Sequence, residues 1–292
     1  MTYHHLSVLV HRQAEKYGDK IALKYRDYET AQWIPISWKE FSQTVRRTAD
    51  AMVALGIEPQ ANIGIFSQNK PECLFTDFGA FANRAVTIPL YATSSPAQAQ
   101  YIINDAQIRY LFVGEQFQYD AAFSVFGFCQ SLQQLIIFDR AVVKDPRDMT
   151  SIYFDEFMAM DEELQHNAIV EERTAAASDD DLANILYTSG TTGEPNGAML
   201  RDRLVFTVGD LMISSRPSVT ITPYRSKGTP SSSYSDGGTY ALPSGIATEE
   251  GLTGRSSAKR NVKASNVSQS SYAGLWMSRK LHSLPNEGIR KR

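Results

Sequence analysis

The sequence predicts an α/β fold built on a largely parallel sheet, and three observations lead to this. Short apolar runs alternate with amphipathic stretches between residues 6 and 187. Several amphipathic stretches begin at a capping motif or a proline, as helices do. Strands that alternate with helices favour parallel pairing, with helices covering both faces of the sheet. We therefore expect a partial α/β domain over residues 1–200 and a separate tail over residues 201–292.

The amino-terminal part combines two helices with a hairpin. Apolar residues recur at helical spacing from Leu6, and Gly18 ends that stretch. A capping box, Ser37 to Glu40, opens the second helix, and Gly56 ends it. The expected elements are a helix over 6–17, hairpin strands over 21–25 and 33–36 with a polar turn over 26–30, and a helix from 38 to about 55.

The alternation is regular after residue 60. Pro71 lies where the first residue of a helix is expected, and Ser95 to Gln98 forms a second capping box with a proline just inside it. The expected strands are 63–66, 86–90, 110–113, 135–138 and 182–187, and the expected helices are 71–82, 96–105, 116–126, 153–160 and 164–173.

Composition places the chain among globular proteins of the cytoplasm. A hydrophobic content of 42% and an aromatic content of 11% are sufficient for a packed core. The two cysteines, Cys73 and Cys129, provide neither a disulfide framework nor metal-ligand spacing, which fits a reducing compartment. The first ten residues lack the basic start of a signal peptide, and no apolar run reaches the length of a membrane span.

A Gly-, Ser- and Thr-rich segment follows the last predicted strand. Residues 188–193 read TSGTTG, and such a loop offers backbone N–H groups and hydroxyls with little side chain in the way. This is the chemistry that holds a polyphosphate. A solvent-exposed turn is the simpler interpretation of the composition alone. The spacing does not match a Walker A motif or the dinucleotide-binding fingerprint.

The order of residues in this segment is more specific than its composition. Residues 187–195, YTSGTTGEP, resemble the phosphate-binding signature of the AMP-producing, adenylate-forming acyl-CoA synthetases. Residues 36–41, 51–57 and 62–72 resemble the amino-terminal blocks of that superfamily in the same order. Residues 85–94, AVTIPLYATS, are most similar to its long-chain fatty acid–CoA ligase branch. The resemblance covers about residues 6–200, so the chain is identified as the amino-terminal part of such a ligase.

The resemblance implies an activity, its substrates and its site residues. The family activates a fatty acid with ATP to an acyl-adenylate, which coenzyme A then converts to acyl-CoA. Mg²⁺ is the implied metal, and Thr188 is the residue placed near it; no catalytic residue can be assigned. The expected partners are small molecules rather than nucleic acid, and peripheral membrane association fits a lipid substrate. The residues implied to hold the phosphates of ATP are Thr188, Ser189, Gly190, Thr191, Thr192 and Gly193.

One residue departs from the family pattern. The family has a lysine between the proline and the last glycine of the signature, and this chain has Asn196. A neutral amide forms weaker hydrogen bonds with phosphate than a charged ammonium does. We therefore expect weaker nucleotide binding, unless the side chain at this position points into solvent.

The tail over residues 201–292 shows no resemblance to the family. It holds 17 serines and 9 glycines, with 14 Lys and Arg against 6 Asp and Glu, a net charge of +8. This composition predicts disorder after about residue 216. A lost reading frame near Leu200 explains the abrupt change most economically. The later family motifs then have no counterpart, so we expect a truncated, inactive fragment. The alternatives are a non-catalytic remnant that binds nucleotide weakly and a degraded enzyme domain fused to a basic interaction tail.

Overall fold

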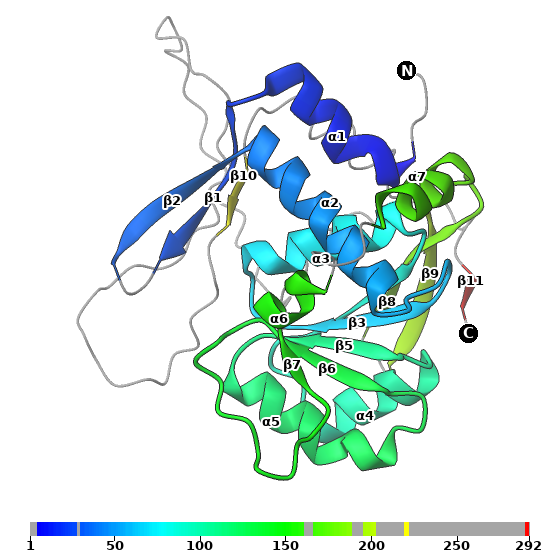
Figure 1. Cartoon of the computed structure of the whole chain (residues 1–292). Coiled ribbons are helices and arrows are strands. Elements are labelled where there is room, and N and C mark those ends of the chain that lie inside the picture. The colour runs from blue at the N-terminus through cyan, green and yellow to red at the C-terminus, as the bar shows by residue number, and fades with distance from the viewer. Residues whose placement is uncertain are drawn as a thin grey trace, which may run out of the picture.

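The computed structural model describes residues 5–27, 30–160, 166–188, 195–202, 219–221 and 290–291. Its centre is an eight-stranded sheet covered by helices on both faces (Figure 1). The predicted α/β fold with alternating strands and helices is confirmed. No helix among these described residues is both long enough and apolar enough to cross a membrane.

The strands from β8 to β7 run parallel along the sheet. The order is β11-β9-β8-β4-β3-β5-β6-β7, and the two strands at the β11 end pair antiparallel. The chain enters the sheet at its middle, because β3 lies between β4 and β5. The bounds are β3 Asn62–Phe66, β4 Val86–Leu90, β5 Tyr110–Val113, β6 Gln134–Ile137, β7 Ile152–Tyr153, β8 Leu182–Thr188, β9 Asn196–Arg201 and β11 Arg290–Lys291.

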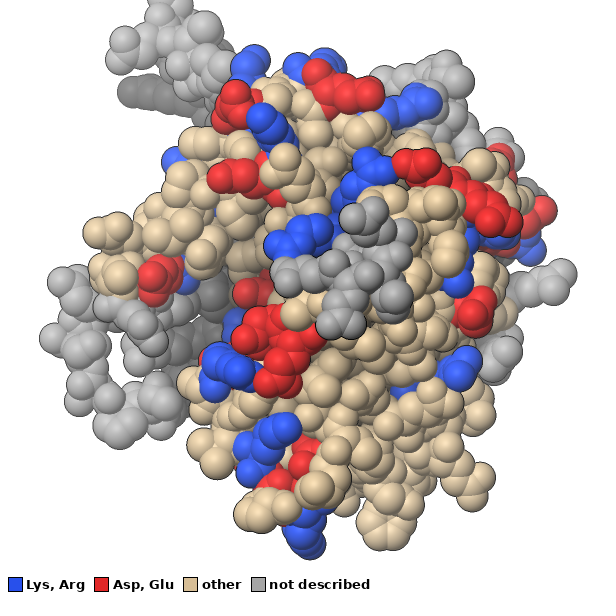
Figure 2. Space-filling model, viewed as in Figure 1, with Lys and Arg blue, Asp and Glu red and all other residues tan. Residues whose placement is uncertain are grey.

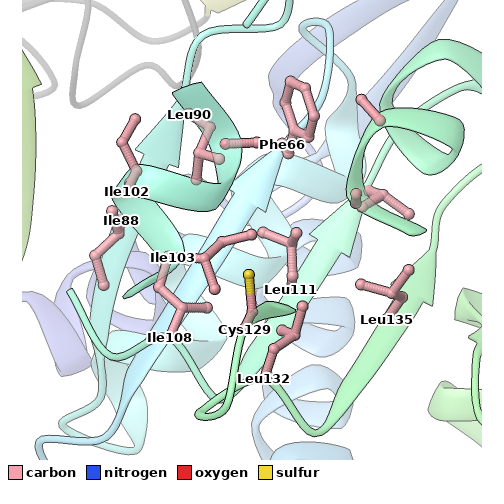
Figure 3. Close-up of a cluster of buried hydrophobic side chains, with 14 of the residues drawn as sticks. Phe66, Ile88, Leu90, Ile102, Ile103, Ile108, Leu111, Cys129, Leu132 and Leu135 are labelled. Atoms are coloured by element: carbon pink, nitrogen blue, oxygen red, sulfur yellow. The ribbon is translucent and has the colours of Figure 1, made fainter. Parts of the chain in front are cut away.

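Alternate residues of the buried strands point to two different helical layers. In β5, Leu111 and Val113 join the core on the side of α4 and α5, part of which Figure 3 shows. Tyr110 and Phe112 join the core on the side of α2, α3 and α6. Both faces are apolar because both are covered, as expected for parallel strands. The helices are α2 Trp38–Ala54, α3 Pro71–Ala82, α4 Pro96–Asp105, α5 Gln116–Val125, α6 Phe154–Ala159 and α7 Asn167–Ala175.

A second, three-stranded sheet lies beside the first helices. It consists of β1 (Ile21–Asp27), β2 (Gln32–Ser37) and β10 (Val219–Ile221), with β1 in the middle. Helix α1 (Leu6–Tyr17) packs on α2 and α3 through a shared apolar cluster that includes Trp38 and Phe41. Burying one such aromatic side chain contributes roughly 1.5–3 kcal/mol. This cluster therefore fixes the hairpin against the α2–α3 layer.

The predicted helix ends are confirmed in detail. In both capping boxes, the serine side chain accepts a hydrogen bond from the backbone N–H three residues on, and the Glu40 or Gln98 side chain accepts one from the serine N–H. Gly56 has a φ of +83°, a conformation that glycine adopts without strain. Pro71 is the first residue of α3.

Some element boundaries differ from the prediction. The strand expected over 135–138 is β6, which lies one residue earlier, and Tyr153 belongs to β7 rather than to the following helix. The helix expected over 164–173 is α7, while residues 161–165 lie outside the described residues. Strands β7 and β9 are not predicted from the sequence. Strand β7 has two residues, and β9 begins with Asn-Gly, a pair typical of turns, and lacks β-branched residues.

Little of the tail is described. Strand β10 pairs with β1, and β11 pairs with β9, although composition predicts no order in this region. Five residues do not test that prediction, because residues 203–218, 222–289 and 292 lie outside the described residues. The prediction of disorder in the tail therefore stays a prediction.

Substituting Gly114 with alanine should destabilise the fold. Gly114 follows β5, and an added Cβ would lie 2.4 Å from Ser67 Oγ and 3.0 Å from its Cα, which belongs to the backbone. The neighbouring chain must shift, at a cost of about 1–3 kcal/mol. Chemical denaturation measures this loss. Gly127→Ala is the matched control because no atom lies within 4 Å of its added Cβ; equal stability of the two variants would contradict the expectation.

Candidate functional site at the carboxyl edge of the sheet

The Gly-rich segment lies in sequence between β8 and β9, which pair antiparallel as a hairpin. Strand β8 runs parallel to β4 and ends at Thr188 at the carboxyl edge of the sheet. Strand β9 returns antiparallel from Asn196, and Thr188 pairs with Asn196 at the base of the turn. Ligands of parallel α/β sheets bind beyond this edge. Thr188, the first residue of the Gly-rich segment, lies at this edge, and the chain continues beyond the segment as a strand, β9.

The structure describes only the base of this hairpin turn. Thr188 and Asn196 are both exposed, so their side chains are accessible to a ligand. The exposure of Asn196 fits a side chain that contacts phosphate and equally one that points into solvent. Both interpretations of the missing lysine therefore stay open. The other predicted phosphate ligands lie outside the described residues: Ser189, Gly190, Thr191, Thr192 and Gly193.

Side-chain contacts hold β8 against α4 and β9 against β8. The hydroxyl of Tyr187 donates a hydrogen bond to Asp105 Oδ2 on α4, and its ring meets that of Tyr101 edge to face with centroids 6.5 Å apart. Gly197 lies directly against Tyr187, since an added Cβ would be 3.1 Å from its Cζ. The last glycine of the signature therefore lets β9 pack closely on β8.

A second group of charged residues lies at the same edge, beyond β3, β5 and β6. Lys70 Nζ is 3.0 Å from Glu115 Oε1 and 3.7 Å from Asp139 Oδ2. Burial opposes the charge on Lys70, but Glu115, Glu72 and Asp139 together raise its pKa. Burial raises the pKa of the Glu72 carboxyl. The sequence analysis does not single out Lys70 or Glu115; their positions directly after two apolar strands are the signal that could have found them.

A different polar cluster lies at the amino end of β8. Asp181 precedes β8, and Arg84 donates hydrogen bonds of 2.8 and 2.9 Å to its two carboxylate oxygens. His5 Nε2 lies 3.4 Å from Asp181 Oδ2 and 3.1 Å from Asp202 Oδ2. Burial lowers the pKa of His5, although Asp181 opposes this. Far from the carboxyl edge, this cluster anchors the start of α1 to the β8–β9 hairpin.

The described residues show neither a continuous basic area on the face in Figure 2 nor a cluster of metal-binding side chains. Figure 2 shows basic and acidic side chains side by side across one face, with no continuous basic area among its described residues. Within the described parts of the chain, no three His, Cys, Asp or Glu side chains are grouped so that they could hold a metal ion.

Comparison with known proteins supports the same interpretation. The chain is 30% identical over 195 residues to the long-chain-fatty-acid–CoA ligase ACSBG1 of Bos taurus, an alignment that covers 66% of this chain and 26% of that protein. It is 30% identical over 212 residues to ACSBG1 of Homo sapiens, which covers 69% of this chain and 28% of the relative. The chain thus spans about a quarter of the length of these curated relatives.

A solved structure has a similar fold. The crystal structure of the anthranilate CoA ligase AuaEII in complex with anthranoyl-AMP aligns with a TM-score of 0.56 and 19% identity, over 69% of this chain and 35% of that one. Residues 10–219 match the AMP-binding enzyme family, so the match extends past Leu200, where the recognisable motifs end. With more than half of its length inside this match, the chain belongs to the AMP-binding enzyme family.

Proposed function

We propose that this chain carries the phosphate-binding, amino-terminal part of an ATP-dependent long-chain fatty acid–CoA ligase. One observation carries the proposal: β8 ends at the carboxyl edge of the sheet, where the Gly-, Ser- and Thr-rich segment of the sequence begins. The curated relatives named as long-chain-fatty-acid–CoA ligases support the substrate class. The substrates would be ATP, a long-chain fatty acid and coenzyme A.

In the proposed reaction the fatty carboxylate attacks the α-phosphate of ATP, which releases pyrophosphate and gives an acyl-adenylate. The thiolate of coenzyme A then attacks the acyl carbon and releases AMP. This chain contributes binding and orientation: the hydroxyls of Thr188, Ser189, Thr191 and Thr192 and the N–H groups of Gly190 and Gly193 hold the β- and γ-phosphates. Fixed donors of this kind stabilise charge that builds up during nucleotidyl transfer.

The hairpin also fits a magnesium ion that arrives with ATP. Mg²⁺ keeps several waters and commonly binds through substrate phosphates plus one or two protein oxygens. The exposed hydroxyl of Thr188 is such an oxygen. When bound, the ion would neutralise phosphate charge. We further propose a cytoplasmic location, which the two unpaired cysteines support, and a peripheral contact with membranes that supply the fatty acid.

Two alternatives predict different behaviour. A non-catalytic remnant would bind nucleotide weakly or not at all. A degraded enzyme domain fused to a basic tail would bind a polyanion through residues 201–292, where the net charge is +8. The nucleotide sequence of the gene separates the proposed function from the first alternative: if a second reading frame after Leu200 encodes further family motifs, the ligase function describes the parent gene and the non-catalytic remnant describes this polypeptide.

Removing one phosphate ligand should weaken ATP binding. In Thr192→Val the chain loses a hydroxyl that would donate to a charged phosphate, and hydrogen bonds to charged groups contribute about 1.5–3 kcal/mol. The dissociation constant for Mg·ATP, measured by calorimetry, should rise roughly 10- to 150-fold. Thr30→Val is the control, because Thr30 is exposed in the β1–β2 turn, far from β8. Unaltered affinity in Thr192→Val, or no binding by the unaltered chain, would overturn the proposal.

Introducing a lysine at the position that departs from the family pattern should strengthen binding. Asn196 is exposed beside Thr188, so Asn196→Lys adds a positive charge without disturbing the core. Replacing a neutral hydrogen bond to phosphate with a charged one contributes about 0.5–2 kcal/mol, or roughly 2- to 30-fold in affinity. The same titration measures it. Asn196→Gln is the control; an equal effect of Lys and Gln would show that charge is not the cause.

A further inference from the structure

A pair of buried polar residues joins the strand below the Gly-rich turn to its neighbour. Asn184 of β8 and Thr87 of β4 are both fully buried, with 0% exposure. They lie opposite each other in the one register pair that the structure records between these strands. Asn184 Nδ2 donates to Thr87 Oγ1 at 2.5 Å, and an interaction with the Thr87 hydroxyl lowers the pKa of the Asp77 carboxyl on α3, against the rise that burial causes. Polar contacts thus link β8 through β4 to α3.

Apart from these two residues, the buried stretches of β4 and of β8 up to Leu186 contain only apolar side chains. Thr87 is the only polar residue of β4, and Asn184 is the only one between Leu182 and Leu186 of β8. Parallel strands covered on both faces normally read as continuous apolar runs. Two isolated polar residues that face each other across neighbouring strands therefore call for a physical reason.

Stability alone does not supply that reason. Asn184 Oδ1 and Asp77 Oδ1 are buried and accept no hydrogen bond from any described residue. A well-packed apolar set at these positions would avoid this unfavourable burial. Single buried polar residues in apolar interfaces are known to select one register among several.

Contacts at the two ends of β8, Arg84 with Asp181 and Tyr187 with Asp105, also favour its register. Asn184 with Thr87 is the contact between them that faces β4. A slip of one residue would turn the apolar face of β8 outward, so the side-chain pattern already excludes it. A slip of two residues keeps both faces and is not excluded by that pattern. It would place Asn184 opposite Ala85 or Pro89 and leave its amide without a partner, which disfavours the slipped state by roughly tenfold or more. Pro89 has no N–H, so β4 also has fewer backbone donors with which to fix its neighbours.

We propose that Asn184 and Thr87, backed by Asp77, are positioning residues that lock the register of β8 and thereby place the Gly-rich turn for ATP. A two-residue slip would move Thr188 by about 7 Å along the strand direction, more than the length of a hydrogen bond, so phosphate ligands would lose their alignment. The role in ATP binding rests on the proposed function, whereas the control of register does not.

The test compares Thr87→Val with Thr87→Ser and Thr76→Val in the full chain. Valine removes the hydroxyl with little change in volume, and serine restores it. Thr76 is the matched control: it is equally buried, adjoins Asp77 on α3, and its hydroxyl has no partner among the described residues. Hydrogen exchange is measured for the amides of β8, with those of β5 as the internal reference, together with the dissociation constant for Mg·ATP.

We expect roughly tenfold faster exchange in β8 relative to β5, and about twofold weaker ATP binding because part of the population is slipped, in Thr87→Val but not in Thr87→Ser or Thr76→Val. A double variant, Thr87→Val with Asn184→Val, removes both polar side chains between the strands but leaves the Asp77 carboxyl on α3. It should still show fast exchange in β8 relative to β5. Equal acceleration of β8 and β5, or none in β8, overturns the proposal. If the unaltered chain binds no ATP, the proposed function fails, while the exchange comparison still decides the control of register.

Discussion

The 292-residue chain, assayed alone with ATP, Mg²⁺, a long-chain fatty acid and coenzyme A, should form no measurable acyl-CoA. It spans about a quarter of the length of its curated relatives, and its tail shows none of the later motifs of the resembled family. The hairpin between β8 and β9 would hold the phosphates, but adenine and ribose would lack fixed partners. The α-phosphate would then not be aligned with the carboxylate, and alignment can supply roughly 7–11 kcal/mol of catalysis.

The measurement is pyrophosphate release by purified protein. Asn196→Lys is the informative companion variant, since tighter phosphate binding should not restore turnover when the nucleoside is not held. Boiled protein gives the background rate. Turnover of about 1 per second or faster, which is typical of enzymes, would show that these residues suffice for the whole reaction.

The stability of the fold should depend on pH through Asp77. This carboxyl is buried on α3, and burial raises its pKa to about 7, against a model-peptide value near 4, although the interaction with Thr87 opposes the rise. The Cys73 thiol on the same helix also interacts with it electrostatically. A raised carboxyl pKa means that the folded state binds the proton more tightly. The contribution of Asp77 is therefore largest below pH 4 and is lost as pH rises to about 7.

The variant Asp77→Asn isolates this contribution. Asparagine keeps an oxygen that can interact with the Thr87 hydroxyl but cannot ionise, so the variant should be more stable than the unaltered chain at pH 8. The free energy of unfolding should rise by a few kcal/mol, since a shift of one unit in a pKa corresponds to about 1.4 kcal/mol. Chemical denaturation from pH 4 to 8 measures the free energy of unfolding of both proteins. The contributions of other titrating groups cancel in the difference between the two values. A difference that stays constant across this range would contradict the prediction.

The elements that the sequence predicts well are those with local signals. The Ser37 and Ser95 capping boxes, Gly56 and Pro71 each specify a helix end through contacts within a few residues. The alternation of short apolar runs with helices is also a local pattern, and it yields the parallel sheet. The Gly-rich segment is recognisable for the same reason, because its residues are consecutive.

The features that the sequence does not predict depend on distant residues. Strand β9 forms because β8 is available to pair with it, and its own residues favour a turn. Asn184 and Thr87 are 97 residues apart, and their hydrogen bond exists only after β8 adds to β4. Lys70 and Glu115 likewise meet only at the assembled edge of the sheet. Positions after apolar strands place Lys70 and Glu115 at that edge, but no spacing along the chain indicates which residues pair.

A crystal structure of the chain with a non-hydrolysable ATP analogue and Mg²⁺ tests the central claim most directly. The account predicts that the β- and γ-phosphates lie against residues 188–193, with the metal near Thr188 and with Asn184 opposite Thr87 in the sheet. Phosphates bound at another place, such as beside Lys70 beyond β3, would contradict the claim that the β8–β9 hairpin is the phosphate site.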